Sequence, residues 1–399
     1  MLKNICTQNK KPYIMFAQVT LQDWENLVKK QLKTEDIYAV LTKVNLEGIS
    51  VKPYYADTDF VLKNLPKVEE STHLVAKYQD NLEEHAYAFL LEHNVEHLTE
   101  KTLFVANKDL AGHISLADDN QYISLIDVFE NQEINTQLAE ELLSKNFKRN
   151  IAVDTTLYQN AGASITQQLA LALAKVKDLA EVFGAEILEK LVFKFAVGGN
   201  YFFEIAKIRA FKILFNQLSK EFGLDSIPYI FTETSLRNKA KNDEENNLIR
   251  STLELSAAMI AGSDAVYSND FKVQNSNSLS EEISFKQQIV LAYESIINVF
   301  DDAANGSYYI EEITHQFSEN AWKLFLELEN SGGFVENLKS GKIAKMIYQQ
   351  AIAEQNWVEE GKIKLIGVNL YPKLEKTKSV EQLYNPQEIK PVRWAEMFE

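Results

Sequence analysis

The chain has 399 residues, 46% of them hydrophobic, which is enough for one large folded domain or two medium ones. Its formal net charge is −16, and an acidic surface argues against binding to nucleic acid or to anionic membranes. The single cysteine, Cys6, excludes an intrachain disulfide scaffold and a multi-cysteine zinc site. The leader lacks an apolar signal-peptide core, and no run of 18 apolar residues occurs, so we expect a cytoplasmic protein without a membrane span.

Residues 1–65 are predicted to form an N-terminal arm. Apolar residues recur at helical spacing at Trp24, Val28 and Leu32, so the pattern predicts a helix over 20–33. Residues 44–53 alternate like a short hairpin, with Gly48 at the turn.

From about residue 70, short apolar runs alternate with helix-length segments. The runs predicted as strands are 72–76, 102–105, 113–117, 150–155, 191–197, 228–232, 264–268 and 363–368. The segments predicted as helices are 164–183, 200–222, 247–261, 281–300 and 309–329. This alternation calls for a parallel sheet with right-handed crossovers. Eight strands suit an α/β fold of the closed (β/α)8 TIM barrel type, and an open doubly wound sheet is the alternative.

We expect the barrel to span 66–370, shortened in its first half, and residues 371–399 to form a wrap or linker. Three prolines, at 372, 386 and 391, indicate that this tail has no regular helix or strand pattern. The stretch NLEEHAYAFLL, residues 81–91, has the pattern of an amphipathic helix. His93 and His97, in the stretch LEHNVEHLTEK that follows, have a spacing that could place two metal ligands on one helix face. The charges around them favour an exposed helix end instead, so no metal site is predicted.

Candidate functional residues lie near the predicted strand ends. Asp154 ends a strand, at the face where such barrels keep their active sites, whereas Asp264 begins one and should lie nearer the opposite face. Glu204 is expected to form ion pairs with Lys207 and Arg209 on its own helix. The full set of candidate rim residues is Asp154, Tyr158, Gln159, Asn160, Glu204 and Asp264.

The absence of certain motifs, and of arginine from the first part of the chain, narrows the range of functions that this protein could have. The chain has no GxGxxG after a strand, no GxxxxGK[ST] and no GxSxG, which counts against nucleotide-binding and α/β-hydrolase roles. No arginine occurs before Arg149, so the first part of the chain is poorly equipped to hold an anionic substrate such as an acyl-CoA.

Five ordered blocks carry a family resemblance: LEGISVKPYYADTDF, VDTTLYQNAGASITQQLALALA, FAVGGNYFFEIAKIRAFKILF, NNLIRSTLELSAAMIAGSDAVYSNDF and DDAANGSYYIEEITHQFSENAWKLFLELENSGGF. They resemble blocks of the methylmalonyl-CoA mutase family, in the same order. KIKLIGVNLYP is similar to that family's last barrel strand, and IKPVRWAEMFE to the stretch that closes its barrel domain. The resemblance covers about residues 20–399, with a poor match near 60–148. VGGNYFFEIAK and GSDAV are more similar to the family's small subunit.

The resemblance implies a TIM barrel and a place in propionate metabolism. The family interconverts methylmalonyl-CoA and succinyl-CoA with adenosylcobalamin, and its small subunit pairs with a catalytic large subunit as a heterodimer. The arm, residues 1–65, would be a subunit contact.

This sequence departs from the catalytic pattern, however. Leu157 stands where catalytic subunits have a histidine that contacts the substrate carbonyl, and leucine cannot donate a hydrogen bond. The family's substrate-binding tyrosine segment and its carboxylate-binding arginine have no counterpart, and no DxHxxG cobalamin motif occurs.

We therefore expect this chain to contribute no catalytic, cofactor-binding or metal-binding residue, with adenosylcobalamin held by the partner subunit. Two alternatives stay open: a stand-alone binding or regulatory barrel derived from the mutase, and a barrel enzyme of another class that uses Asp154 and Glu204.

Overall fold

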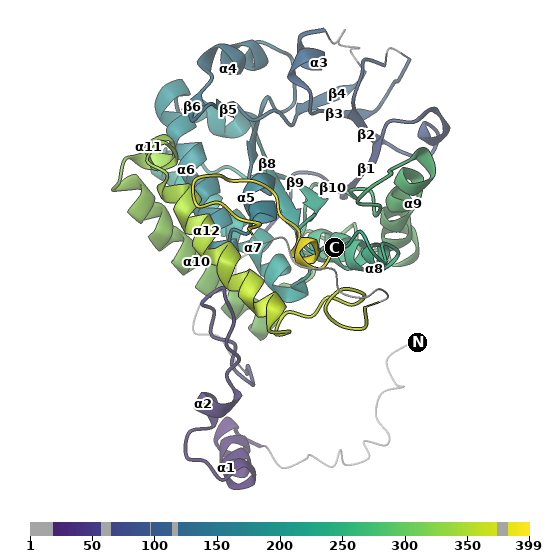
Figure 1. The fold of residues 1–399 in the computed structure, drawn as a ribbon. Helices are drawn as coiled ribbons and strands as arrows, with labels where there is room; N and C mark the ends of the chain where they lie inside the picture. The colour runs from purple at the N-terminus through teal and green to yellow at the C-terminus, as the bar shows by residue number, and fades with distance from the viewer. Residues whose placement is uncertain (1–18, 57–64, 96, 114–118, 373–381) are drawn as a thin grey trace, which may run out of the picture.

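The core of the molecule is a parallel β-barrel. The computed structural model describes residues 19–56, 65–95, 97–113, 119–372 and 382–399 (Figure 1). Within these residues, eight parallel strands follow one another as β4-β3-β2-β1-β10-β9-β8-β7. Their bounds are β1 His73–Lys77, β2 Ala88–Leu91, β3 Thr102–Val105, β4 Gln121–Ser124, β7 Ile151–Asp154, β8 Leu191–Val197, β9 Tyr229–Thr234 and β10 Ala265–Tyr267.

The two edge strands, β4 and β7, meet and close the barrel. Parallel bridges join Ile123 to Arg149 and Asp127 to Ala152. Backbone hydrogen bonds run along the same seam, from the Ser124 amide to the Arg149 carbonyl at 2.9 Å and from the Ala152 amide to the Ile126 carbonyl at 2.9 Å. The strands therefore follow chain order around the barrel, and the predicted (β/α)8 architecture is confirmed over the open sheet.

Side chains of each strand alternate between the barrel interior and the surrounding helices, as a pleated strand requires. In β8, Val192 belongs to a cluster inside the barrel, whereas Phe193 and Phe195 belong to the outer core. Phe193 packs on Phe211 and Phe215 of the following helix, with ring centroids 4.7 Å apart in both pairs.

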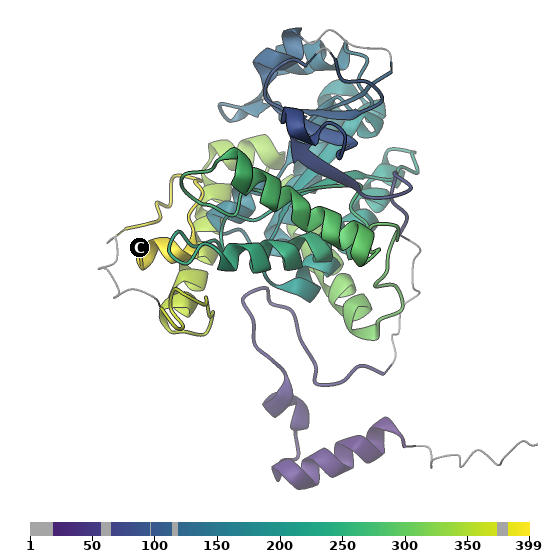
Figure 2. The same ribbon diagram turned by 90° about the vertical axis from the view of Figure 1, so that its right-hand side faces the viewer.

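Helices surround the barrel unevenly, with the long ones gathered beside β7 to β10 (Figures 1 and 2). The helices that follow β6 in the chain are α4 Thr136–Leu143, α5 Thr156–Ala161, α6 Ile165–Phe183, α7 Tyr201–Glu221, α8 Asn246–Ile260, α9 Ser278–Ile289, α10 Tyr308–Glu329, α11 Gly333–Lys339 and α12 Lys342–Glu359. In the described part of the chain, the connections between β1 and β4 carry only the 3₁₀ turn η1 Asp80–Leu82 and the short α3 Lys108–His113, while α9 packs against β1 from later in the chain, with Gln288 donating to the Val75 carbonyl at 3.1 Å. The remaining short elements are the hairpin β5 Phe129–Glu130 and β6 Glu133–Ile134, the 3₁₀ turns η2 Ala185–Lys190 and η4 Trp394–Met397, and the π-helical turn η3 Val290–Glu294.

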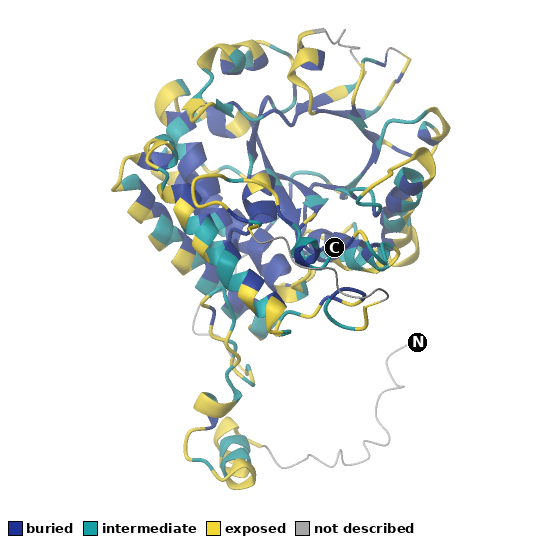
Figure 3. Cartoon of the chain, in the orientation of Figure 1, coloured by how far each residue is buried: buried dark blue, intermediate teal, exposed yellow. Residues whose placement is uncertain are grey.

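The N-terminal arm projects from the barrel and carries α1 Leu21–Leu32 and α2 Ile37–Leu41 (Figures 1 and 2). Lys43 and Val51 form an antiparallel bridge, and Gly48 has a positive φ of 69°, so the predicted hairpin is present in minimal form. The Ser50 amide donates to Gln316 on α10 at 2.8 Å, and Gln350 on α12 donates to the Leu46 carbonyl at 3.3 Å. The hairpin is thus fixed to the barrel, while α1 and α2 beyond it are largely exposed (Figure 3).

Several predicted elements were wrong. Residues 363–368 lie outside the barrel sheet and form only an isolated bridge between Ile366 and Leu370. Asn369 explains this, because its side chain accepts from the Leu365 amide and donates to the carbonyls of Val358 and Ile363, which holds the segment as a turn. The predicted strand 113–117 lies outside the described residues except for His113, which ends α3.

The described residues of 81–101 are not helical beyond η1, and β2 passes through them instead. The four consecutive apolar residues of Ala88–Leu91 pack on both faces of a barrel strand, which the helical interpretation had missed. His93 and His97 consequently share no helix face, and each contacts the ring of Tyr78. The predicted helix 281–300 ends earlier, at Ile289, and continues as the single π-helical turn η3.

Candidate functional site at the carboxyl ends of β7, β8 and β9

The carboxyl ends of β7, β8 and β9 open on a cavity of about 520 Å³. The loops after β8 and β9 supply one wall, at Gly198 to Asn200 and at Ser235 to Asn238. The hairpin of the arm supplies Asn45 to Glu47, and helix α12 with the C-terminal segment supplies Glu354, Trp357 and Trp394. Active sites of this fold lie at this end of the barrel, so the cavity is the candidate site.

Lys207 lies beneath the cavity and contacts several of the residues that line it. This fully buried lysine on α7 pairs with Glu204 at 2.5 Å and donates to Gln159 at 3.0 Å, to Gln168 at 3.3 Å and to the Ala196 carbonyl at 2.6 Å. The predicted ion pair of Glu204 is therefore present. Because the Lys207 ammonium group lies among four acceptors, Glu204 and Gln159 are fixed by their contact with it and are not available for acid–base catalysis.

Arg209, the other predicted partner of Glu204, points elsewhere. It forms ion pairs with Asp302 at 2.9 Å and with Glu311 at 2.6 Å, and it donates to Thr314 at 3.0 Å. The expected pairing of Arg209 with Glu204 is wrong because two buried carboxylates on the loop before α10 and on α10 itself satisfy the guanidinium instead.

Asp154 lies in the barrel mouth and is paired. It lies 3.2 Å from Lys194, which also pairs with Glu233 at 3.0 Å, and it accepts from the amide and the hydroxyl of Thr156 at 2.8 and 2.7 Å. Burial alone would raise the pKa of Asp154, but Lys194 and the Thr156 hydrogen bonds outweigh it and lower the pKa. Asp154 is therefore an ionised partner of a lysine and a poor general base.

Tyr158 and Asn160 are also held by neighbours. The Lys175 ammonium lies 5.3 Å from the centre of the Tyr158 ring and pairs with Asp127 at 2.5 Å. Asn160 accepts from the Ser235 hydroxyl at 3.1 Å and from the Leu236 amide at 3.0 Å. Asn160 thereby ties the loop after β7 to the loop after β9.

Asp264 lies at the amino end of β10, apart from the other candidates. It accepts from the amides of Val68 at 2.6 Å, Glu69 at 2.9 Å and Ile230 at 2.7 Å. Burial raises its pKa to about 6 despite these bonds. Its place at the stability face of the barrel argues for a structural role.

Charged residues that the sequence patterns did not single out also line the cavity, among them Arg237, Glu354 and Glu47. Arg237 pairs with Glu354 at 2.7 Å and donates to the Val392 carbonyl at 2.7 Å. Glu47 reaches in from the arm and accepts from the Ile165 amide at the start of α6 at 2.8 Å. Burial and the nearby Glu354 raise the pKa of Glu47 to about 8. The scarcity of arginine was the one sequence signal that could have pointed to Arg237.

The axis of the barrel is filled by side chains. Phe104, Tyr229 and Phe231 are buried in the interior cluster together with Ile123 and Leu125. The rings of Phe104 and Phe231 meet edge to face, with centroids 5.0 Å apart. This arrangement is a packed core of the kind that fills the interior of such barrels.

Leu157 lies away from this interior. Its side chain is 42% exposed and lines a separate cavity of about 760 Å³, together with Phe129, Tyr348 and Pro386. An apolar side chain at this position supplies neither a proton nor a hydrogen bond.

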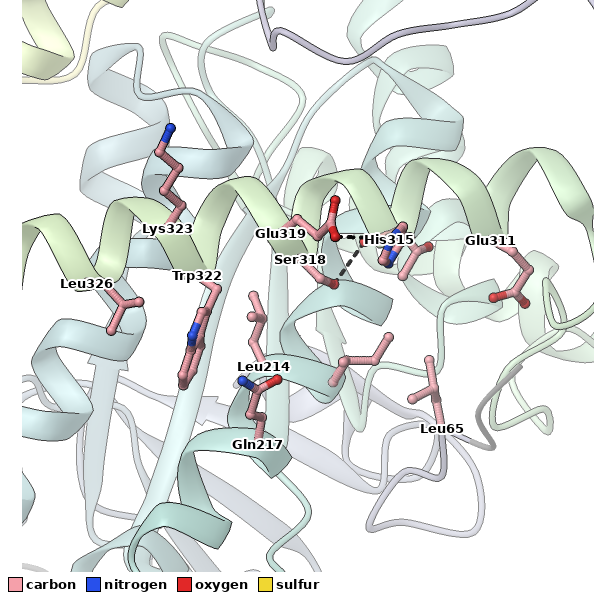
Figure 4. A pocket seen from close by; sticks show the side chains of 12 residues that line it. Leu65, Leu214, Gln217, Glu311, His315, Ser318, Glu319, Trp322, Lys323 and Leu326 are labelled. Carbon is pink, nitrogen blue, oxygen red and sulfur yellow. Dashed lines mark hydrogen bonds and ion pairs between the residues drawn. The ribbon is translucent and has the colours of Figure 1, made fainter. Parts of the chain in front are cut away.

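A third hollow lies on the outer surface between α7 and α10, with a volume of about 660 Å³ (Figure 4). His315 and Glu319 point toward each other along α10, 3.3 Å apart, above Leu214 and Gln217 of α7. This groove lies outside the barrel, away from the strand ends, so it is not the candidate active site. Among the described residues, no group of three or more histidine, cysteine, aspartate or glutamate side chains is arranged to hold a metal ion.

Comparison with known proteins gives a consistent result. A family model described as methylmalonyl-CoA mutase matches residues 131–397. The methylmalonyl-CoA mutase small subunit of Porphyromonas gingivalis is 35% identical over 246 residues, which cover 56% of this chain and 38% of that protein. The methylmalonyl-CoA mutase of Rhizobium meliloti is 29% identical over 237 residues, covering 56% of this chain and 33% of that protein.

The large subunit of the Porphyromonas gingivalis mutase is 27% identical over 245 residues, covering 58% of this chain and 34% of that protein. In each of these three comparisons the match takes in less than two fifths of the relative's own length. The described helices include none long and apolar enough to cross a membrane.

Proposed function

Because the chain belongs to the methylmalonyl-CoA mutase family, we propose that it is a small, non-catalytic subunit of a coenzyme-B12-dependent mutase. In this proposal it pairs with a catalytic large subunit in the cytoplasm and stabilises it. Of the two Porphyromonas gingivalis subunits, the small one is more similar in sequence to this chain than the large one, at 35% against 27% identity. The substrates and the cofactor of the assembly would be handled by the partner.

The observation that carries the non-catalytic role is the filled barrel. A thioester and a carboxylate must be held rigidly in a dry barrel for the isomerisation to proceed. Here Phe104 and Phe231 occupy the interior, Leu157 replaces the histidine, and Asp154 is already paired with Lys194.

These residues do not fit a substrate or adenosylcobalamin site, so we assign no step of the reaction to this chain. The residues that ligate cobalamin in the family, DxHxxG, do not occur in the 399 residues.

The exposed arm supports pairing. Helix α1 presents Leu21 and Leu32, each 43% exposed, and the arm projects clear of the barrel (Figure 2). A single helix with an apolar face is marginal alone and needs a surface to cover it.

The test is co-expression with a full-length large subunit, followed by affinity purification through a tag on this chain. We expect the two chains to elute together and the complex to turn over methylmalonyl-CoA with adenosylcobalamin. This chain alone should show no turnover, and the Leu157→His variant should show none either, because the barrel stays filled. Turnover by the purified chain alone would overturn the non-catalytic role, and failure to co-elute would overturn the pairing.

A further inference from the structure

The turn that leads into α10 contains the single asparagine–glycine pair of the sequence, Asn305-Gly306. The Asn305 side chain is exposed. Among the described residues, Asn305 forms hydrogen bonds only through its backbone, where its amide donates to the Asp302 carbonyl at 3.2 Å. Because no such bond fixes the carboxamide, it can rotate toward the main chain that follows it.

Gly306 leaves space around the peptide bond that joins it to Asn305. Gly306 has a positive φ of 84°, and a Cβ built on it would meet no atom of a more distant described residue within 4 Å. A glycine has no side chain to crowd its own nitrogen, and its backbone torsions are less restricted than those of other residues. The peptide group can therefore bring the Gly306 nitrogen against the side-chain carbonyl carbon of Asn305.

We propose that Asn305 is a site of spontaneous deamidation, with water as the co-reactant. The Gly306 nitrogen attacks the side-chain carbonyl carbon of Asn305 and forms a bond to it. The carbon–nitrogen bond of the carboxamide breaks, and its nitrogen leaves as ammonia with the proton that Gly306 gives up. Water then opens the cyclic imide at one of its two carbonyls. The product is aspartate, or isoaspartate, in which the main chain runs through the former side chain and is one carbon longer.

The reaction removes a hydrogen-bond donor from a buried ion pair. The Gly306 amide donates to Glu311 at 3.0 Å, and Glu311, which is 5% exposed, pairs with Arg209 at 2.6 Å. The imide nitrogen carries no hydrogen, so this bond is lost when the ring closes. In isoaspartate the extra carbon of the main chain displaces the restored amide from Glu311. A buried carboxylate that loses a donor destabilises the segment that carries it.

The affected segment is the first turn of α10, because Glu311 lies in it. The same turn contains Tyr309, whose ring contacts that of Tyr55 in the arm, with centroids 5.2 Å apart. Conversion of Asn305 to isoaspartate therefore loosens the start of α10 and weakens the contact that the arm makes with it.

The experiment incubates the folded full chain at neutral and at mildly alkaline pH and follows each asparagine by peptide mapping with mass spectrometry. Asn305 should become acidic, with isoaspartate among the products, and should do so faster at the higher pH because the attacking nitrogen must lose its proton. Asn330 is the internal control, since it is also exposed but is followed by Ser331. Conversion at Asn305 should be faster than at Asn330 by about tenfold, which corresponds to about 1.4 kcal/mol in the activation barrier.

Three results would overturn the assignment. They are equal rates at Asn305 and Asn330, conversion of Asn305 to aspartate without isoaspartate, which indicates direct hydrolysis, and an unchanged Asn305 in the folded chain while the same residue is converted in the urea-unfolded chain. The Asn305→Gln variant, whose longer side chain does not place its carbonyl for a five-membered ring, should show no conversion at this position.

Amide exchange in residues 308–312 measures the effect on α10. Exchange should accelerate in the wild-type chain as isoaspartate accumulates, and it should stay slow in the Asn305→Gln variant incubated in the same way. Asn305→Asp is the matched control, because it adds the charge without lengthening the main chain. A carboxylate near the start of a helix is favourable, so this variant should exchange like fresh wild-type chain. Unchanged exchange in the isoaspartate form would overturn the link between Asn305 and α10.

Discussion

The filled barrel makes Phe104 the most informative residue to truncate. Phe104 is fully buried and packs edge to face on Phe231 with centroids 5.0 Å apart. Replacing Phe104 by alanine removes about 2 kcal/mol of transfer free energy. A residual cavity of about 80 Å³ costs about 2 kcal/mol more, at about 24 cal/mol per Å³. We therefore expect Phe104→Ala to lower the free energy of unfolding by about 4 kcal/mol.

Urea denaturation followed by far-ultraviolet circular dichroism measures this loss, at one fixed protein concentration because association would shift the midpoint. Tyr371→Ala is the control, since Tyr371 is 77% exposed and its truncation should change the free energy of unfolding by less than about 0.5 kcal/mol. A loss below about 1 kcal/mol for Phe104→Ala would refute the reasoning. It would mean that the axis is loosely filled and open to a ligand, which would remove the main support for the non-catalytic role.

Two further predictions concern charged groups at the site. Lys194→Met removes the lysine that Asp154 and Glu233 share in the barrel mouth and should lower the free energy of unfolding by about 3 kcal/mol. Adding Asp154→Asn should recover part of this loss in the same urea assay, and full additivity of the two changes would contradict the pairing of Asp154 with Lys194. The pKa of Glu47 is raised from 4.5 to about 8. The favourable contribution of Glu47 to the stability of the folded state is therefore complete below pH 4.5 and is lost as the pH rises through about 8. Amide exchange in the hairpin 43–51, corrected for its intrinsic pH dependence, should therefore accelerate with pH in the wild-type chain and not in Glu47→Gln; equal pH profiles would show that Glu47 does not hold the arm.

Much of the second half of the fold could be predicted from periodicity. The predicted strand 191–197 coincides with β8, and the helix predicted over 164–183 differs from α6 by one residue. Long amphipathic helices and apolar strands carry a strong local signal. Strands β2 and β4 have only four residues each, and a run that short is ambiguous between helix, strand and loop. Segment 363–368 has the composition of a strand, but Gly367 with φ of 80° and the side chain of Asn369 impose a turn.

The candidate site could be predicted only in part, because local sequence patterns record contacts within one element but not contacts between distant segments. The Glu204–Lys207 pair lies within one helix, so its spacing is visible in the sequence. Glu47, Arg237 and Glu354 meet in the cavity from segments more than 100 residues apart. No local pattern records that they converge, because only the closure of the barrel brings the arm, the β9 loop and α12 together.

The pairing of β1 with β10 also governs how the protein is made. His73 lies beside Ala265 in the finished barrel, so the first strand must wait for its neighbour while about 190 residues are synthesised. At about 5 to 20 residues per second, this interval is roughly 10 to 40 s. During it, strands β1 to β3 are accompanied only by η1 and by connections with little helix, and their apolar faces lack the later helices that complete the core. The nascent chain therefore exposes these apolar strand faces throughout that interval, and we expect its yield in a cell to depend on the chaperones that meet it at the ribosome.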